Sequence, residues 1–439
     1  MAHTWKSSEK AVFRLVFLFF FLQVVPLDWK YWRHVFAIDW SALHFGDIFY
    51  ISRYTPQWLE SYRPGKWGLF SWEDWGINGI IALAGAIIWG LAEKGQPDYG
   101  RLQYLLRALV RYRLAVALLA YGFIKLFPMQ APYPSLSHLN TAYGDFSAWK
   151  LFALSLGIVP GYESFLGVVE TLAGLLLLFR RTATLGASIV IFFTGNVFMS
   201  NLAYEGGEVV YSFYLVSLAL FVVAYDLQRI ISLIILRRPA QPAIHRPLFI
   251  TTGWRYGKLV AKALFIFFFV ALYGSRVYTA YAKGGYHYPA APGLKGWEGI
   301  YNVAVFRLNG QELPYALNDS IRWKNVVFEK WATLSIGISR ENAATVTNTE
   351  EISVPDGGRT FESDGVSGRR YYAYKADTAQ RVIVLADNSR LRYERKSDSL
   401  VVLAGLVHGT DSIYAELQRT DKRYLLQEAK KGRRKPLKL

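Results

Sequence analysis

Long apolar runs recur along the chain up to about residue 281 and are absent beyond it. Each run is long enough to cross about 30 Å of hydrocarbon, because a helix rises about 1.5 Å per residue. The first run has no small-residue cleavage site after it, so we expect an uncleaved anchor rather than a signal peptide. We predict about seven transmembrane helices, at residues 11–27, 75–92, 105–127, 162–179, 183–202, 209–236 and 259–281.

Beyond residue 288 the pattern changes to short stretches in which apolar and polar residues alternate. Residues 299–306, 381–385 and 400–403 have the composition of strands, and Asn309-Gly310 and Asp387-Asn388 are typical of hairpin turns. These signals predict a small antiparallel β domain, of which a meander barrel is the more specific form. The fold class expected for the whole chain is an all-α polytopic membrane bundle followed by this β domain.

Composition supports a membrane protein and excludes several kinds of chemistry. The chain of 439 residues is 52% hydrophobic and 19% charged, with a mean hydropathy of +0.16. It has no cysteine, which excludes disulfides, thiolate nucleophiles, Cys-ligated zinc and iron–sulfur clusters. The seven histidines are dispersed, so no metal site is expected. A net charge of +17 could indicate nucleic acid, but the basic residues are scattered among apolar runs, so the expected partner is the lipid bilayer and no nucleic acid.

The basic residues also predict an orientation, because cytoplasmic loops of membrane proteins are enriched in Lys and Arg. Alternate loops are rich in these residues if the N-terminus is cytoplasmic, and an odd number of spans then places the β domain outside. We expect a multi-pass protein of the bacterial cytoplasmic (inner) membrane with a periplasmic β domain. Topology alone explains Arg107, Arg111 and Arg113, although they could also bind lipid phosphate or an acidic partner. The basic tail at residues 430–435 is expected to be solvated.

The first outer loop is rich in tryptophan. Its rings could lie at the level of the lipid headgroups or form a small aromatic-cored cap, and the sequence does not separate the two. The residues are Trp29, Trp32, Trp40, Trp58, Trp67, Trp72 and Trp75.

Glu170 is the most informative single residue, because it lies well inside the fourth apolar run. An ionised carboxylate there costs a few kcal/mol unless it is paired or hydrated. Gly167, Thr171 and Gly174 share its helix face, which predicts a face that packs on other helices rather than on lipid. We predict an outward-facing polar pocket in which Lys125 or Tyr121 compensates Glu170, or alternatively a structural network that fixes helix register. Candidate ligand-binding residues on the same side are Asn196, Asn201, Tyr204, Glu205, Glu208 and Tyr211.

Residues 105–236 resemble the DoxX/DoxD-like family of integral membrane proteins. The resemblance rests on Gly-x-x-Lys at residues 122–125, Gly-x-x-Glu at residues 167–170 and a Leu-rich stretch before a basic turn. It implies a compact four-helix membrane unit with Lys125 and Glu170 as its polar pair, and with Gly122 and Gly167 as packing positions. The family's namesake is a subunit of a thiosulfate:quinone oxidoreductase. This chain differs by its additional spans, a long outer insertion at residues 128–160 and the β domain.

Two functional hypotheses follow from these features. In the first, the chain is a membrane component of a quinone-linked redox system, with a membrane or soluble partner subunit. Its pocket binds a quinone head group or a small anion, with Lys125 and Tyr121 as donors and Glu170 as proton acceptor. In the second, the chain is a non-enzymatic anchor, transport or envelope-assembly protein that presents the β domain. The predicted parts are two helices with the Trp-rich loop, the DoxX-like four-helix unit, a cytoplasmic loop with the last helix, and the β domain, at residues 1–104, 105–236, 237–288 and 289–439.

Overall fold

The chain forms two compact units in the computed structural model. The first, which we call the helical unit, comprises Met1–Phe127 and Ser164–Ala282, and the second, the β unit, comprises Pro128–Glu163 and Lys283–Leu439. The outer insertion at residues 128–160 lies within the predicted four-helix unit at residues 105–236. In the structure it groups with the β domain instead. The structure describes residues 5–59, 71–94, 99–240, 252–283, 286–317, 319–339 and 361–426, so the predicted basic tail lies outside the described residues.

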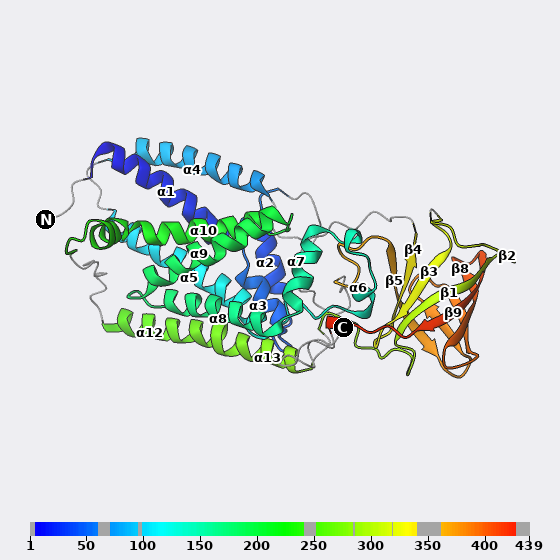
Figure 1. The fold of residues 1–439 in the computed structure, drawn as a ribbon. Helices are drawn as coiled ribbons and strands as arrows, with labels where there is room; N and C mark the ends of the chain where they lie inside the picture. The colour runs from blue at the N-terminus through cyan, green and yellow to red at the C-terminus, as the bar shows by residue number, and fades with distance from the viewer. Residues whose placement is uncertain are drawn as a thin grey trace. The chain divides into compact units, whose positions relative to one another are not determined.

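The helical unit consists of long helices, with shorter helices in the chain between some of them (Figure 1). Ser71 caps α4 by accepting a hydrogen bond from the Asp74 amide, as expected where four N–H groups begin a helix without partners. The helices are α1 (Ser7–Val24), α2 (Trp29–Ala37), α3 (Phe45–Ser52), α4 (Trp72–Ala92), α5 (Gly100–Leu126), α8 (Pro160–Leu177), α9 (Ala183–Ala203), α10 (Val209–Ala224), α11 (Leu227–Ile230), η2 (Ile231–Ile235), α12 (Thr252–Ile266), η3 (Phe267–Leu272) and α13 (Tyr273–Lys283).

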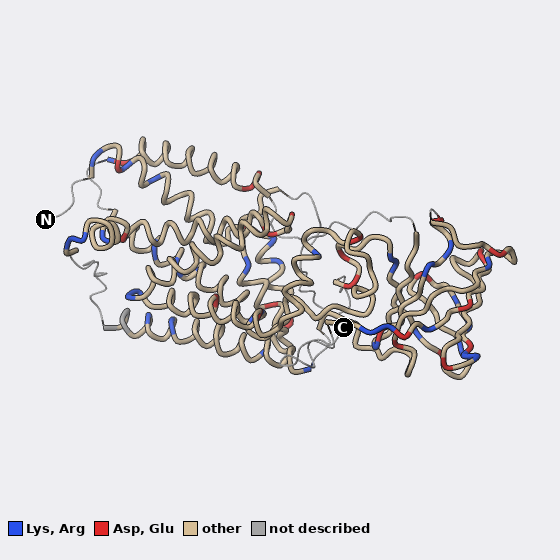
Figure 2. The backbone as a smooth tube through the Cα atoms, in the orientation of Figure 1, with Lys and Arg blue, Asp and Glu red and all other residues tan. Residues whose placement is uncertain are grey.

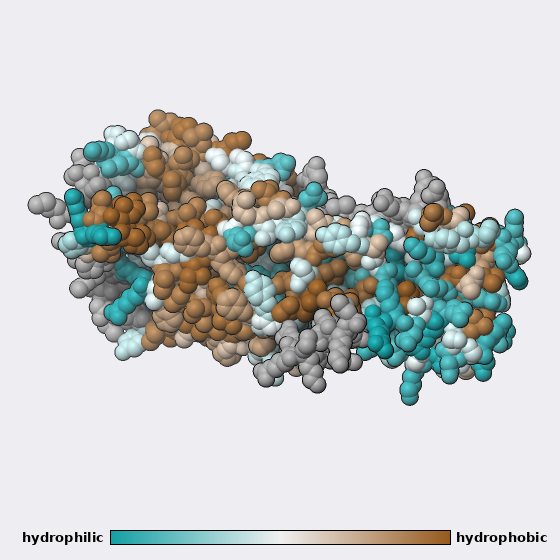
Figure 3. All heavy atoms as spheres, in the orientation of Figure 1, coloured by the Kyte–Doolittle hydropathy of each residue, from teal (hydrophilic) through white to brown (hydrophobic). Residues whose placement is uncertain are grey.

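Several of these helices are long and apolar enough to cross a membrane. Among the described residues four stretches qualify, or up to six if two bent pairs, α7 (Ala148–Gly157) with α8 and α10 with α11–η2, are each one span. The structure thus contains several candidate membrane-spanning helices, as a multi-pass membrane protein requires, whereas the count of seven stays a prediction. The helix α5 is absent from this set because four arginines and a lysine lie along it. Figure 3 shows an apolar surface over the helical unit, and Figure 2 shows that its charges gather mainly near the helix ends.

The Trp-rich loop contains both an exposed and a buried helix. On α2, Trp29 and Phe36 are 64% and 69% exposed. The next helix, α3, is buried through Phe45, Ile48 and Phe49, and it packs against α5. Part of this loop is therefore buried within the helical unit. Trp67 lies outside the described residues.

The β unit contains a closed antiparallel barrel, which confirms the more specific form of the prediction. Apart from the short β2, each strand pairs with the next along the chain, and β1 pairs with β9 from Ile300 to Leu308, which closes eight strands into a barrel. The short β2 extends the edge of β1 after the predicted Asn309-Gly310 turn. The strands are β1 (Gly299–Leu308), β2 (Gln311–Glu312), β3 (Trp323–Phe328), β4 (Thr333–Ile338), β5 (Arg369–Asp377), β6 (Val382–Leu385), β7 (Arg390–Arg395), β8 (Leu400–Val407) and β9 (Asp411–Thr420).

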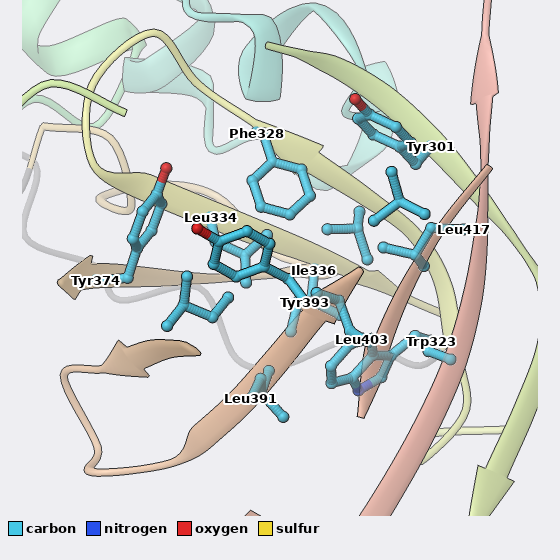
Figure 4. Packing of buried hydrophobic residues seen from close by; sticks show 14 of the residues in the cluster. Tyr301, Trp323, Phe328, Leu334, Ile336, Tyr374, Leu391, Tyr393, Leu403 and Leu417 are labelled. Carbon is cyan, nitrogen blue, oxygen red and sulfur yellow. The ribbon is translucent and has the colours of Figure 1, made fainter. Parts of the chain in front are cut away.

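Side chains fill the barrel interior. Inward-facing residues from all the long strands form one apolar cluster that includes Tyr301, Phe328, Leu334, Leu391 and Leu417 (Figure 4). An eight-stranded barrel is just wide enough for such filling. The barrel is therefore a packed core. The insertion adds α6 (Leu136–Leu139), η1 (Tyr143–Asp145) and α7 (Ala148–Gly157) to this unit.

Candidate functional site

The predicted glycine face of α8 lies directly against α5. A Cβ atom on Gly122 would meet Thr171 Oγ1 at 2.5 Å, and one on Gly167 would meet the backbone nitrogen of Leu126 at 2.1 Å. A Cβ atom on Gly174 would lie 3.0 Å from a leucine side chain of α5. The two backbones can approach this closely only because these positions lack side chains.

This close approach brings Lys125 and Glu170 together. Lys125 Nζ donates to Glu170 Oε1 at 2.6 Å, and the two side chains are only 8% and 5% exposed. Among the described residues, the second carboxylate oxygen, Oε2, has no hydrogen-bond partner. The pair therefore neutralises its charges but leaves one buried acceptor available.

A second charged pair lies beside the first. The Tyr121 hydroxyl donates to Glu208 Oε1 at 2.8 Å, and Arg53 Nη2 approaches the same oxygen at 3.2 Å. The Arg53 guanidinium also lies 5.2 Å from the centroid of the Phe49 ring. Glu170 and Glu208 are close enough to interact electrostatically, so the two pairs form one network.

The buried helix α3 explains how Arg53 reaches this network. His44 and Asp47 form a reciprocal cap at the start of α3, and Arg53 follows its last residue. Within the helical unit, Arg113 of α5 donates to the carbonyl oxygens of Val24 and Ile51, which holds the neighbouring segments. Arg53 was not among the site residues predicted from the sequence.

The ring of Tyr121 lies at the centre of these groups. The Arg53 guanidinium and the Lys125 ammonium each lie 5.9 Å from its centroid, and the Tyr211 ring lies 5.6 Å away. The Tyr211 hydroxyl is buried and, among the described residues, has no hydrogen-bond partner. We call these six residues the Tyr121 cluster: Arg53, Tyr121, Lys125, Glu170, Glu208 and Tyr211.

The other predicted ligand-binding residues differ in their placement. Asn201 supports the cluster indirectly, because its Oδ1 accepts the backbone N–H of Glu208 at 3.3 Å. Asn196, Tyr204 and Glu205 have exposed side chains. The structure thus brings together five of the predicted residues, with Asn201 in a supporting position, and leaves these three outside the cluster.

The β unit holds a separate set of buried polar groups. Glu362 accepts hydrogen bonds from Trp331 Nε1 at 2.7 Å and from the Thr333 hydroxyl at 2.9 Å. Glu329 accepts from the amide and hydroxyl of Ser137, both at 2.6 Å, which fastens α6 to the barrel. Burial and the charge of Glu329 raise the pKa of Glu362 to about 7, and burial also raises the pKa of Glu329.

This raised pKa predicts that the β unit is more stable in mild acid. Between the ordinary value of 4.5 and about 7, the folded unit holds a proton on Glu362 that the unfolded chain releases. Stability therefore rises as the pH falls from 8 to 5. Hydrogen exchange of the β4 and β5 peptides in the full chain, corrected for intrinsic exchange, should show greater protection at pH 5.5 than at pH 8.

The variant Glu362→Gln should lose most of this pH dependence, because its side chain stays neutral. The matched control is Glu312→Gln, since Glu312 is exposed and pairs with Arg307 at the barrel surface. Equal pH dependence in wild type and Glu362→Gln would contradict the assignment.

No protein-family model matches this chain, and no curated protein or solved structure is significantly similar to it. The DoxX-like resemblance therefore rests on its own short motifs and stays a prediction. The geometry of the Tyr121 cluster is independent of that resemblance.

Proposed function

We propose that this multi-pass protein is a DoxX-like membrane component of a quinone-linked redox system, and that the Tyr121 cluster binds the quinone head group. The observation that carries the proposal is a charge-balanced network with three buried polar atoms that have no hydrogen-bond partner among the described residues, Glu170 Oε2, the Tyr211 hydroxyl and Arg53 Nε. Buried polar groups are normally hydrogen-bonded, so these atoms indicate a polar ligand. The orientation proposed is a cytoplasmic N-terminus and a periplasmic β unit in the bacterial inner membrane, supported by the distribution of basic residues.

The donors and acceptors of the cluster suit a quinone and its reduced form. The Tyr211 hydroxyl can donate to a carbonyl oxygen, and Glu170 Oε2 can accept from a hydroxyl group. The rings of Phe49, Tyr121 and Tyr211 pack against one another and give the cluster an aromatic environment that suits an aromatic head group. Access from outside is supported at one side, where Arg53 and Glu208 are 14% and 16% exposed.

The residues of this chain would position the head group and handle protons. A bound quinone takes up two electrons and two protons when it is reduced. Glu170 and Glu208 are the groups that can hold protons, and Lys125 and Arg53 keep the network neutral when both acids are ionised. The electrons require a bound cofactor or a partner subunit, because a chain without cysteine has no thiol relay.

Quinone content tests this proposal directly. The full chain, purified in mild detergent, should retain extractable quinone, and a short-chain quinone analogue should quench its tryptophan fluorescence on titration. The variant Tyr211→Phe removes a hydroxyl without a described protein partner, so it should fold normally. We expect it to bind the analogue about fivefold to tenfold more weakly, the effect of one lost hydrogen bond.

The matched control is Tyr278→Phe, because Tyr278 is 55% exposed on α13 and outside the cluster. A folded, quinone-free wild-type protein that does not bind the analogue would contradict the redox proposal. It would favour the second candidate function, a non-enzymatic anchor. The packed interior of the barrel supports that alternative, since a filled barrel presents its outer surface rather than a cavity.

A further inference from the structure

The three predicted arginines of α5 have three different environments. Arg107 Nη2 pairs with Asp226 at 2.6 Å, and Arg113 donates to the two backbone carbonyls described above. Arg111 lies between them in sequence, with its guanidinium 5.0 Å from the centroid of the Tyr112 ring. Its Nε atom is buried and has no hydrogen-bond partner among the described residues.

Arg111 faces basic residues of α12. The rings of Tyr112 and Phe265 lie 5.0 Å apart and join α5 to this helix. Lys262 lies within electrostatic range of both Arg111 and Lys258. The α12 side chains therefore add two cations to the one on α5.

A fourth cation comes from the end of α8. Lys262 Nζ lies 3.9 Å from the centroid of the Phe179 ring, and the next residue is Arg180. The Arg180 guanidinium and Lys258 Nζ both lie 6.0 Å from the centroid of the Tyr104 ring. We call Arg111, Arg180, Lys258 and Lys262 the basic cluster.

The charges of the basic cluster are not balanced by the protein residues described. None of its four members forms an ion pair with a described carboxylate. The neighbouring carboxylate, Asp226, already pairs with Arg107 and Arg229. Four cations held close together repel one another, so an anion that binds between them is strongly favoured.

We propose that the basic cluster binds the phosphate group of an anionic phospholipid at the boundary between α5, α8 and α12. A lipid, rather than free phosphate, fits because apolar side chains continue from the cations along α12. Leu259 and Leu264 are each 63% exposed and provide a surface for acyl chains. Lys262 lies one turn beyond Lys258, so its long side chain can reach back to the same headgroup.

Direct lipid binding to the full chain in neutral detergent tests this site. Phosphatidylglycerol should remain bound in native mass spectrometry and raise the thermal midpoint, whereas phosphatidylcholine should do neither. Inorganic phosphate at the same concentration should also have no effect. An equal response to inorganic phosphate would overturn the lipid assignment.

Two variants locate the site. Lys262→Gln should weaken phosphatidylglycerol binding at least fivefold, and Arg111→Gln/Lys262→Gln should abolish the saturable response. The control is Arg276→Gln, which removes an exposed cation from α13, in the same helical stretch, and should bind as wild type does. If Arg276→Gln weakens binding as much as Lys262→Gln, the lipid responds only to overall charge and the proposal fails. The single variant Lys262→Gln keeps the test decisive if the double variant does not fold.

Discussion

Lys125→Met is expected to lower the free energy of unfolding by about 3–5 kcal/mol, because it leaves the buried Glu170 without its counter-ion. The Lys125–Glu170 contact is 2.6 Å long and both side chains are almost fully buried, so water cannot replace the lost partner. The measurement is thermal or denaturant unfolding of the full chain in mild detergent. The control is Lys283→Met, since Lys283 is exposed at the end of α13.

The double variant Lys125→Met/Glu170→Gln should recover most of the lost stability, because both charges are then removed together. Such recovery is expected if the stability cost is that of one unpaired charge. If the double variant is as unstable as Lys125→Met alone, the pair does not form as described. An unchanged Lys125→Met protein would contradict the pair outright.

Unfolding of the Lys125 variants and quinone-analogue binding by Tyr211→Phe together separate a structural role of the Tyr121 cluster from a functional one. Both roles predict that the double variant regains stability, but a purely structural network predicts that Tyr211→Phe has no effect on any binding of the quinone analogue. The proposed binding site predicts that Tyr211→Phe retains stability and loses affinity. The two hypotheses therefore differ in a readout that does not depend on folding.

The parts of the fold that could be predicted are those encoded in local patterns. Residues 183–202 correspond to α9, and residues 75–92 to α4, because a long apolar run has few alternatives to a buried or membrane helix. The β domain was also predictable, since alternating residues and turn dipeptides specify neighbouring strands. Barrel closure is a separate feature of the structure, because it requires β1 to pair with β9, which lies more than 100 residues away.

The structure of the two outer segments could not be predicted in the same way. The apolar part of α3 is only eight residues long, too short to be recognised as a membrane element, and nothing local shows that it packs on α5. The insertion groups with the barrel through Glu329 and Ser137, which lie 192 residues apart. Periodicity indicates which face of a segment is buried, but not what covers it.

In the candidate site, too, the residues in recognisable local patterns could be predicted, and a residue brought in by a distant contact could not. Lys125 and Glu170 were predicted because a charge among small residues requires a partner and because each lies at a recognisable helix position. Arg53 was missed because its partner, Glu208, lies 155 residues away and neither sits in an apolar run. The sequence signal that could have indicated α3, and with it Arg53, is the short aromatic segment before Arg53, in which Asp47 caps the start of a helix.

Gly167→Ala is expected to destabilise the helical unit by about 3 kcal/mol, at the upper end of the range for overpacking. The added methyl group would lie 2.1 Å from the backbone nitrogen of Leu126, so it cannot be accommodated by a side-chain rotation. The two helices α5 and α8 must move apart, which would also lengthen the Lys125–Glu170 contact. Thermal unfolding in detergent measures the loss.

Gly195→Ala on α9 is the matched control, because a Cβ atom there meets nothing within 4 Å among the described residues. Alanine favours a helix over glycine by up to about 1 kcal/mol, so this control should be slightly stabilised. The same substitution thus has opposite signs at two helical glycines, and only the distance to α5 distinguishes them. If both variants are stabilised, the close packing of α5 and α8, and with it the position of Glu170 beside Lys125, would be wrong.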